Sequence, residues 1–246
     1  AAMPAFLPYA PLNTPKAFGS GLWIIDGPEI RMEYGPTSIP FPTRMTVARL
    51  ADGTLWVHSP IAPDKDLLSA IDGLGPVAWL IAPNSLHYWH IADWQAIYSG
   101  ARTLAVPDLA TRAKRPFRID ATLDSEAAVL PEELETVFVP GTLVNEAVFF
   151  HRPSRTVVLT DLIENFEPQR IRSCLYRGLV RLSGAAHPDG KAPIDLRLTF
   201  WPRRARVRRA VAAILGWDCE RVVMAHGLPY ERDGAAELRR ALRWAC

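Results

Sequence analysis

The chain is predicted to fold as a mixed α/β domain in which antiparallel hairpins lead into strand–helix–strand units. Apolar runs of strand length recur along the chain, Asp52-Gly53 marks a tight hairpin turn, and helical periodicity returns between several of the apolar runs. Of its 246 residues, 49% are hydrophobic and 22% are charged, which is the composition of a globular protein. Because we find neither an internal repeat nor a linker in the sequence, we expect one domain over residues 1–246.

The first half of the chain supplies the hairpins and the start of a parallel sheet. Its predicted elements are an extended segment (1–20), two strands around Gly27-Pro28 (22–26 and 30–34), a loop with Pro36, Pro40 and Pro42, a hairpin (45–50 and 54–58) and a helix (64–74). Residues 77–82 are apolar without alternation, which predicts a strand buried on both faces. A helix at 91–98 and a strand at 103–106 complete a strand–helix–strand unit, which indicates parallel pairing.

The second half begins with a polar, weakly patterned stretch at 108–130, which is predicted to be a loop. The elements expected after it are three strands (135–139, 147–151 and 156–160), a helical insertion (162–202), a helix (203–215), a strand (221–225) and a closing helix (234–244).

The charge of the chain bears on binding to nucleic acid or membranes, and its cysteine content bears on the cellular compartment. The net charge of +2, from 28 basic and 26 acidic residues, predicts no general attraction to nucleic acid or to a membrane. The arginines at 203–209 fill the polar face of an amphipathic helix, so a solvated surface is favoured over an RNA-binding one. No apolar run approaches the ~20 residues of a membrane span, and the start does not resemble a signal peptide. Three cysteines without CxxC spacing indicate reduced thiols and a cytoplasmic protein.

Potential metal ligands stand where predicted strands end. His87 and His90 come shortly after the apolar strand at 77–82, and Asp161 and His226 each follow a later predicted strand. If these strands share one sheet edge, their side chains converge there, as they do at the sites of many α/β proteins. Imidazole nitrogens and carboxylate oxygens are ligands of Zn²⁺. Structural roles remain open for each residue; Asp161, for example, could cap the segment that follows it.

The order of these residues resembles that of the metallo-β-lactamase superfamily. That family carries Thr-His-x-His-x-Asp-His at a strand end. Here the motif reads Ala82-Pro83-Asn84-Ser85-Leu86-His87-Tyr88-Trp89-His90. His87 and His90 match the second and third histidines, whereas Ser85 stands in place of the first and Trp89 in place of the aspartate.

Three later motifs extend the resemblance over roughly residues 45–227. The family's Gly-His-Thr loop is similar to Val139-Pro140-Gly141-Thr142-Leu143-Val144-Asn145-Glu146, which lacks the histidine. The strand-end aspartate matches Asp161, and the final histidine matches His226. Three phrases look like an uncharacterised bacterial branch: Trp56-Val57-His58-Ser59-Pro60, Ala82-Pro83-Asn84 with His87, and Thr160-Asp161-Leu162.

The resemblance implies a four-layer αββα sandwich of two mixed β-sheets with a site at the strand ends. It also implies a degenerate metal site, because several family ligands are replaced. We expect at most one divalent ion, with Zn²⁺ favoured over Mn²⁺ or Fe²⁺, bound by His87, Asp161 and His226. His90 or Glu146 would assist, and a carboxylate at Glu146 would favour Mn²⁺ or Fe²⁺ more than a nitrogen would.

Two functions follow from this interpretation. The first is a metallo-hydrolase of a small ester, amide or phosphoester, with His87, Asp161 and His226 as its catalytic residues and a water activated by the ion. The alternative is a metal-free, non-catalytic protein that binds a small ligand, in which the same three side chains form a polar cluster. The sequence does not indicate the substrate or the oligomeric state.

Overall fold

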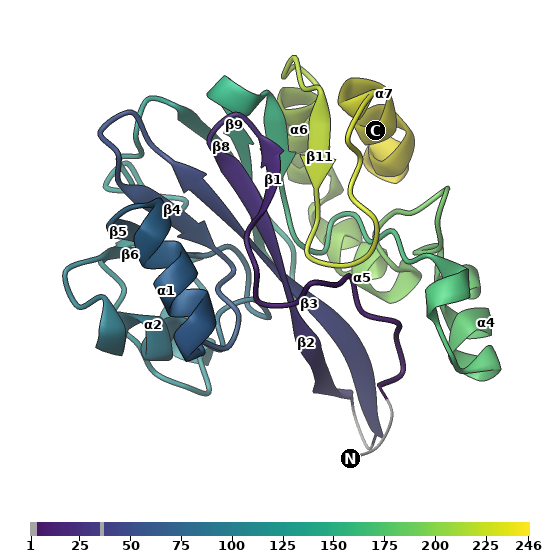
Figure 1. Cartoon of the computed structure of the whole chain (residues 1–246). Helices are drawn as coiled ribbons and strands as arrows, with labels where there is room; N and C mark the ends of the chain where they lie inside the picture. The colour runs from purple at the N-terminus through teal and green to yellow at the C-terminus, as the bar shows by residue number, and fades with distance from the viewer. Residues whose placement is uncertain (1–3, 35–36) are drawn as a thin grey trace.

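The computed structural model describes residues 4–34 and 37–246 and contains two β-sheets packed face to face. Figure 1 shows helices α1 (Lys65–Leu74) and α2 (Ile91–Ile97) outside one sheet, and α6 (Arg204–Ile214) and α7 (Gly234–Leu242) outside the other. The expected four-layer sandwich is confirmed. Within the described ranges, no helix is long and apolar enough to cross a membrane.

The first sheet has seven described strands in the order β1-β2-β3-β4-β5-β6-β7. They are β1 (Lys16–Gly19), β2 (Leu22–Tyr34), β3 (Thr37–Arg49), β4 (Leu55–His58), β5 (Val77–Ala82), β6 (Arg102–Ala105) and β7 (Ala121–Thr122). Pairing is antiparallel from β1 to β4 and parallel from β4 to β7. The change comes where α1 and α2 carry the chain back over the sheet, because parallel neighbours need a crossover connection.

The second sheet has four described strands in the order β11-β10-β9-β8. They are β8 (Leu134–Val139), β9 (Glu146–His151), β10 (Thr156–Val158) and β11 (Arg221–Val223). Only β10 and β11 are parallel. Between those two strands the chain forms α4 (Cys174–Ser183), α5 (Ile194–Phe200) and α6, preceded or joined by the short turns η2 (Pro168–Arg170) and η3 (Trp201–Arg203).

Strand β9 shows how the sequence builds two cores. Ala147 and Phe149 face the first sheet and belong to the large inter-sheet core, whereas Val148 and Phe150 belong to the core under α6 and α7. Successive side chains of a strand point to opposite faces, so a strand buried on both sides is apolar at every position. A third, smaller cluster, which includes Phe6 and Phe166, lies beneath α4.

The structure corrects the predicted N-terminal hairpin. Residues 22–34 form one strand, β2, and Gly27-Pro28 falls in its bulge instead of a turn. Pro40 and Pro42 lie within β3, not in a loop; Pro36 lies outside the described residues. This part of β3 pairs with β2 on one side and with no described strand on the other. Proline, which has no N–H to donate, is therefore tolerated there. Within the extended segment at 1–20, of which residues 1–3 are not described, residues 16–19 form β1.

Three smaller expectations are also corrected. The predicted loop at 108–130 contains α3 (Leu109–Arg112) and β7, which adds to the parallel side of the sheet. In β5 only residues 80–82 are fully buried, while the first three residues are half-buried. Strands β10 and β11 each end two residues earlier than expected, so the potential ligands lie in the loops that follow them.

Candidate metal centre at the strand ends

The loops after β5, β10 and β11 bring His87, Asp161 and His226 together. His87 Nε2 lies 3.4 Å from Asp161 Oδ1, and His226 Nε2 lies 3.3 Å from the same oxygen. One ligand atom from each residue lies within 4.8 Å of the other two. The side chains are 12%, 4% and 7% exposed, respectively, so the cluster lies just below the surface.

The donor set and its spacing fit a single divalent ion. Two imidazole nitrogens and a carboxylate oxygen are common Zn²⁺ ligands, and atoms about 2.1 Å from a tetrahedral ion stand about 3.4 Å apart. The two distances to Asp161 Oδ1 agree with that value. Three protein ligands also leave one tetrahedral position for water or substrate.

Strand β3 of the first sheet orients His226. The His226 Nδ1 lies 2.8 Å from the carbonyl oxygen of Pro42, to which it must donate a hydrogen bond. A neutral His226 ring therefore carries its lone pair on Nε2, facing Asp161 Oδ1. Two such acceptors repel each other unless a proton or a cation lies between them. Arg44, buried on the same strand, donates to the carbonyls of Met224 and Gly227 on either side of His226 and fixes this loop.

His87 is oriented by residues that follow β4 and β5. Its Nδ1 lies 2.7 Å from Ser59 Oγ, which leaves Nε2 toward Asp161. Its backbone N–H donates to Asn84 Oδ1 over 2.8 Å. Hydrogen bonds of this kind fix the ring orientation of a metal-binding histidine and the nitrogen that is free to coordinate.

Asn84 also connects the two sheets at the site. Fully buried, it donates from Nδ2 to Asp161 Oδ2 over 2.6 Å and to Thr160 Oγ1 over 2.8 Å. This contact holds Oδ2 and leaves Oδ1 facing both histidines. The sequence alone did not indicate Asn84 or Ser59 as site residues, although each lies within two residues of the end of a strand that leads into the site.

Glu146 lies behind the cluster. Its Oε1 accepts from the N–H of Thr160 over 2.7 Å, and its Oε2 accepts from the N–H groups of Asp161 and Leu162 over 3.0 and 3.2 Å. Both oxygens are thus used to hold the turn that carries Asp161. The structure does not place this predicted ligand among the converging donor atoms.

His90 also lies outside the cluster. It precedes α2, and its Nδ1 lies 3.1 Å from Asp93 Oδ2. Asp93 is in turn bound by Arg115. Because His90 pairs with Asp93 and is not among the converging donors, the structure brings together three of the five predicted ligands.

The charges of the site concentrate on Asp161. Burial alone would raise the pKa of Asp161, but the two histidines outweigh burial and hold that pKa well below its usual value. Burial would lower the pKa of His87, yet Asp161 and Glu146 prevail and raise it. Burial and the proximity of Asp161 raise the pKa of Glu146 to about 7, and they raise the pKa of Glu164 well above its usual value. One ionised carboxylate between two imidazoles is a site that attracts a cation.

A family model described as a domain of unknown function, DUF4336, matches residues 30–109. No curated protein shows significant similarity to the chain.

Among solved structures, the metallo-β-lactamase from Hirschia baltica is similar with a TM-score of 0.61 and 14% identity over 94% of this chain and 96% of that one. FIM-1 from Pseudomonas aeruginosa, in its mono-zinc form, has a TM-score of 0.58 and 15% identity over 99% and 97%. The enzyme from Pontibacter korlensis has a TM-score of 0.58 and 12% identity over 94% and 97%. The whole chain thus has a metallo-β-lactamase-like fold.

Proposed function

We propose that the protein is a metal-dependent hydrolase that uses one divalent ion, bound by His87, Asp161 and His226. The observation that carries the proposal is the convergence of their three donor atoms, with Asp161 Oδ1 at 3.4 and 3.3 Å from the two nitrogens. Zn²⁺ is favoured by the two nitrogen ligands, ahead of Mn²⁺ or Fe²⁺. The mono-zinc form of the Pseudomonas aeruginosa enzyme supports the use of a single ion by this fold.

In this proposal the ion and the side chains that hold it have separate roles in hydrolysis. A bound ion supplies a Lewis acid and lowers the pKa of a water in its open position. Asp161 and the two imidazoles set where that position lies, because Asn84, Ser59 and the Pro42 carbonyl fix their orientations. We expect a small ester, amide or phosphoester as substrate, since these carry the carbonyl or phosphoryl oxygen that such an ion polarises.

Metal content measured on protein purified without chelator tests the proposal. We expect about one equivalent of divalent metal in the wild type, loss of the metal in His226→Ala, and retention in His90→Ala. The two variants remove the same side chain, but only His226 belongs to the cluster. Occupancy should fall below about pH 6, because imidazole coordinates only when it is neutral.

Hydrolysis of ester, amide and phosphoester model substrates by the metal-loaded protein then separates the two candidate functions. Activity that is lost in His226→Ala and kept in His90→Ala supports the hydrolase. A wild type that binds no metal from Zn²⁺, Mn²⁺ or Fe²⁺ would contradict it. Such a result would favour a metal-free protein that binds a small ligand.

A further inference from the structure

The outer sides of α4 and α5 expose large apolar side chains. On α4, Leu175, Leu179 and Leu182 are 76%, 53% and 82% exposed, and their spacing places them on one stripe. The same spacing recurs along α5 and the turn that follows it. We call the whole set the outer apolar face; its members are Leu175, Leu179, Leu182, Ile194, Leu198 and Trp201.

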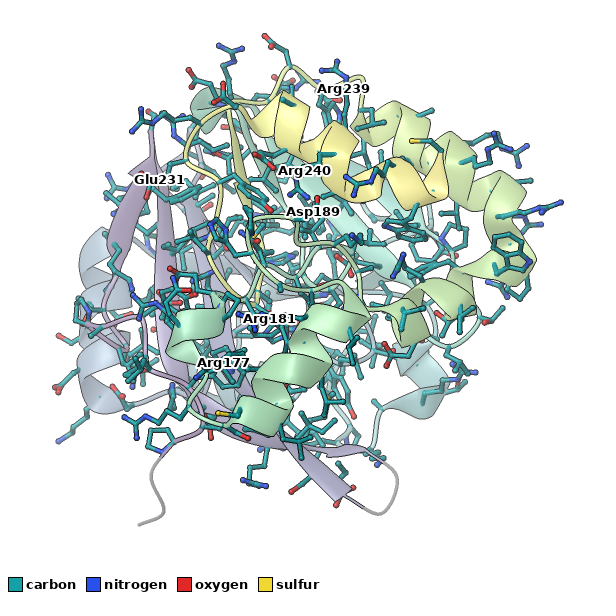
Figure 2. The ribbon with its side chains drawn as sticks, turned by 90° about the vertical axis from the view of Figure 1, so that its right-hand side faces the viewer. Arg177, Arg181, Asp189, Glu231, Arg239 and Arg240 are labelled. Carbon is teal, nitrogen blue, oxygen red and sulfur yellow. The ribbon has the colours of Figure 1, made fainter. Side chains whose placement is uncertain are left out.

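The two helices that carry these stripes are neighbours on one flank of the molecule. Figures 1 and 2 show α4 and α5 together on one flank, with α4 toward the viewer in Figure 2. Arg197 of α5 donates from Nη2 to the carbonyl of Ser183 at the end of α4 over 3.4 Å, so the helices are in contact. Six large apolar side chains exposed on two neighbouring helices indicate a surface that binds a partner.

The segment that contains α4, α5 and the start of α6 is also the basic part of the chain. Residues 168–209 contain eleven arginine or lysine residues and two aspartates, which leaves 17 basic and 24 acidic residues for the rest of the chain. A net charge of +9 on this segment is therefore offset by −7 elsewhere. The balanced total of +2, from which no attraction to a membrane was expected, conceals this separation.

A small cavity of about 200 Å³ adjoins the end of α4. Arg181, His187 and Lys191 are among its lining residues, and the buried His187 Nδ1 has no hydrogen-bond partner among the described residues. Asp189 also lines it and lies 3.5 Å from Lys191, but its carboxylate is held mainly by Arg240 at 2.8 Å and by Arg243 at 3.0 Å. Figure 2 shows Asp189 between Arg181 on α4 and Arg240 on α7. The cavity thus offers cationic and unpaired groups to an anion.

We propose that the outer apolar face docks on the surface of an anionic phospholipid bilayer, with a headgroup phosphate in the cavity between Arg181, His187 and Lys191. The leucines and Trp201 would enter the boundary between headgroups and acyl chains, while the surrounding arginines neutralise phosphates. Arg204 lies over the Trp201 ring, 5.3 Å from its centroid, which joins an aromatic anchor to a cation at the surface.

The charge of this flank selects a bilayer over the other partners that an apolar face can bind. A two-fold contact between the same faces of two copies would bring two strongly basic segments together, which is electrostatically unfavourable. RNA would satisfy the arginines but would leave the leucine stripes in water. An anionic bilayer satisfies both, because it offers negative charge and an apolar interior next to each other.

Co-sedimentation with lipid vesicles tests the proposal. We expect the full chain to bind vesicles of phosphatidylcholine with about 30% phosphatidylglycerol, to release as salt rises, and to bind pure phosphatidylcholine far less. The double variant Arg181→Gln/Lys191→Gln should bind roughly thirty-fold more weakly, since each basic group near such a surface contributes about five-fold. The double variant Leu179→Ser/Leu182→Ser should lose at least about ten-fold, because both leucines would leave the apolar boundary.

Matched controls remove the same kinds of side chain elsewhere. Val129→Ser removes an apolar residue that is 66% exposed, and Arg239→Gln removes an exposed arginine of α7; both should bind as the wild type does. Circular dichroism melting curves confirm that each variant is folded. Equal binding to neutral and anionic vesicles, or none to either, overturns the proposal. A dimer in solution that is lost in the leucine variant would instead make this face an interface between copies.

Discussion

The contact between Asn84 and Asp161 gives the sharpest test of how the site is built. Asn84→Asp keeps the size of the side chain and keeps an oxygen where Asn84 Oδ1 accepts from the N–H groups of Leu86 and His87. It replaces the amide nitrogen that donates to Asp161 Oδ2 over 2.6 Å with a second carboxylate oxygen. The substitution therefore changes the contacts of Nδ2, which include those to Thr160 Oγ1 and Glu146 Oε2, and preserves the contacts of Oδ1.

The expected loss of stability is large. A hydrogen bond to a charged acceptor contributes about 1.5–3 kcal/mol. Two like charges about 3 Å apart repel by about 5 kcal/mol at an effective dielectric constant of 20, which proton uptake by the pair relieves in part. We expect Asn84→Asp to lower the free energy of unfolding by about 3–6 kcal/mol at pH 8 in chelator. Repulsion from Asp161 would raise the pKa of the introduced carboxyl group on folding, and a pKa raised on folding makes stability fall as pH rises. The loss of stability in the variant should therefore shrink toward pH 5.5, by up to about 1.4 kcal/mol per pH unit.

Urea denaturation at pH 8 and 5.5, with chelator present, measures both quantities. The control is Asn145→Asp, because the hydrogen bond of Asn145 to the Gly141 N–H uses its oxygen, which the substitution keeps. That variant should stay within about 0.5 kcal/mol of the wild type. A deficit below about 1 kcal/mol in Asn84→Asp, or one that does not change with pH, refutes the assigned role of Asn84.

Two further predictions concern other parts of the fold. Burial lowers the pKa of His151 to about 4, so between pH 6.5 and 4 the unfolded chain binds a proton that the folded chain does not. On going from pH 7.5 to 5, urea unfolding should therefore show about 2 kcal/mol less loss of stability in His151→Gln than in the wild type; equal losses would show that His151 titrates normally. Gly227→Ala should lose more than about 3 kcal/mol in thermal unfolding, because Gly227 has a φ of 91° and an added Cβ would lie 2.1 Å from the Asn165 carbonyl oxygen. Gly100→Ala, with open space around it, should be neutral, and similar melting temperatures for the two alanine variants would contradict this account.

The part of the site that could be predicted is the part encoded locally. His87, Asp161 and His226 each follow shortly after an apolar run, and an apolar run of strand length is visible in the sequence. Strands that share a sheet or face each other in a sandwich then bring their ends together. The same logic predicted the hairpin at Asp52-Gly53, where Gly53 has a φ of 82°.

What could not be predicted depends on contacts between distant segments. His90 follows His87 by three residues, but the turn into α2 pairs its ring with Asp93. Glu146 is a plausible ligand by residue type, yet its carboxylate accepts hydrogen bonds from three backbone N–H groups. Those groups come together only in the folded loop after β10. The prolines of β3 suggested a loop, because sequence alone does not show that this part of the strand has a single partner.

The three side chains of the cluster come from both sheets: His87 follows β5 of the first, whereas Asp161 and His226 follow β10 and β11 of the second. Neither sheet alone can assemble the site, so an ion held there would cross-link the two halves of the sandwich. Folding and metal binding are then thermodynamically linked, and free metal at a hundred times its dissociation constant would add about 2.7 kcal/mol to the stability of the fold. If the proposed ion binds, a substitution that loosens the contact between the two sheets should therefore also weaken its binding.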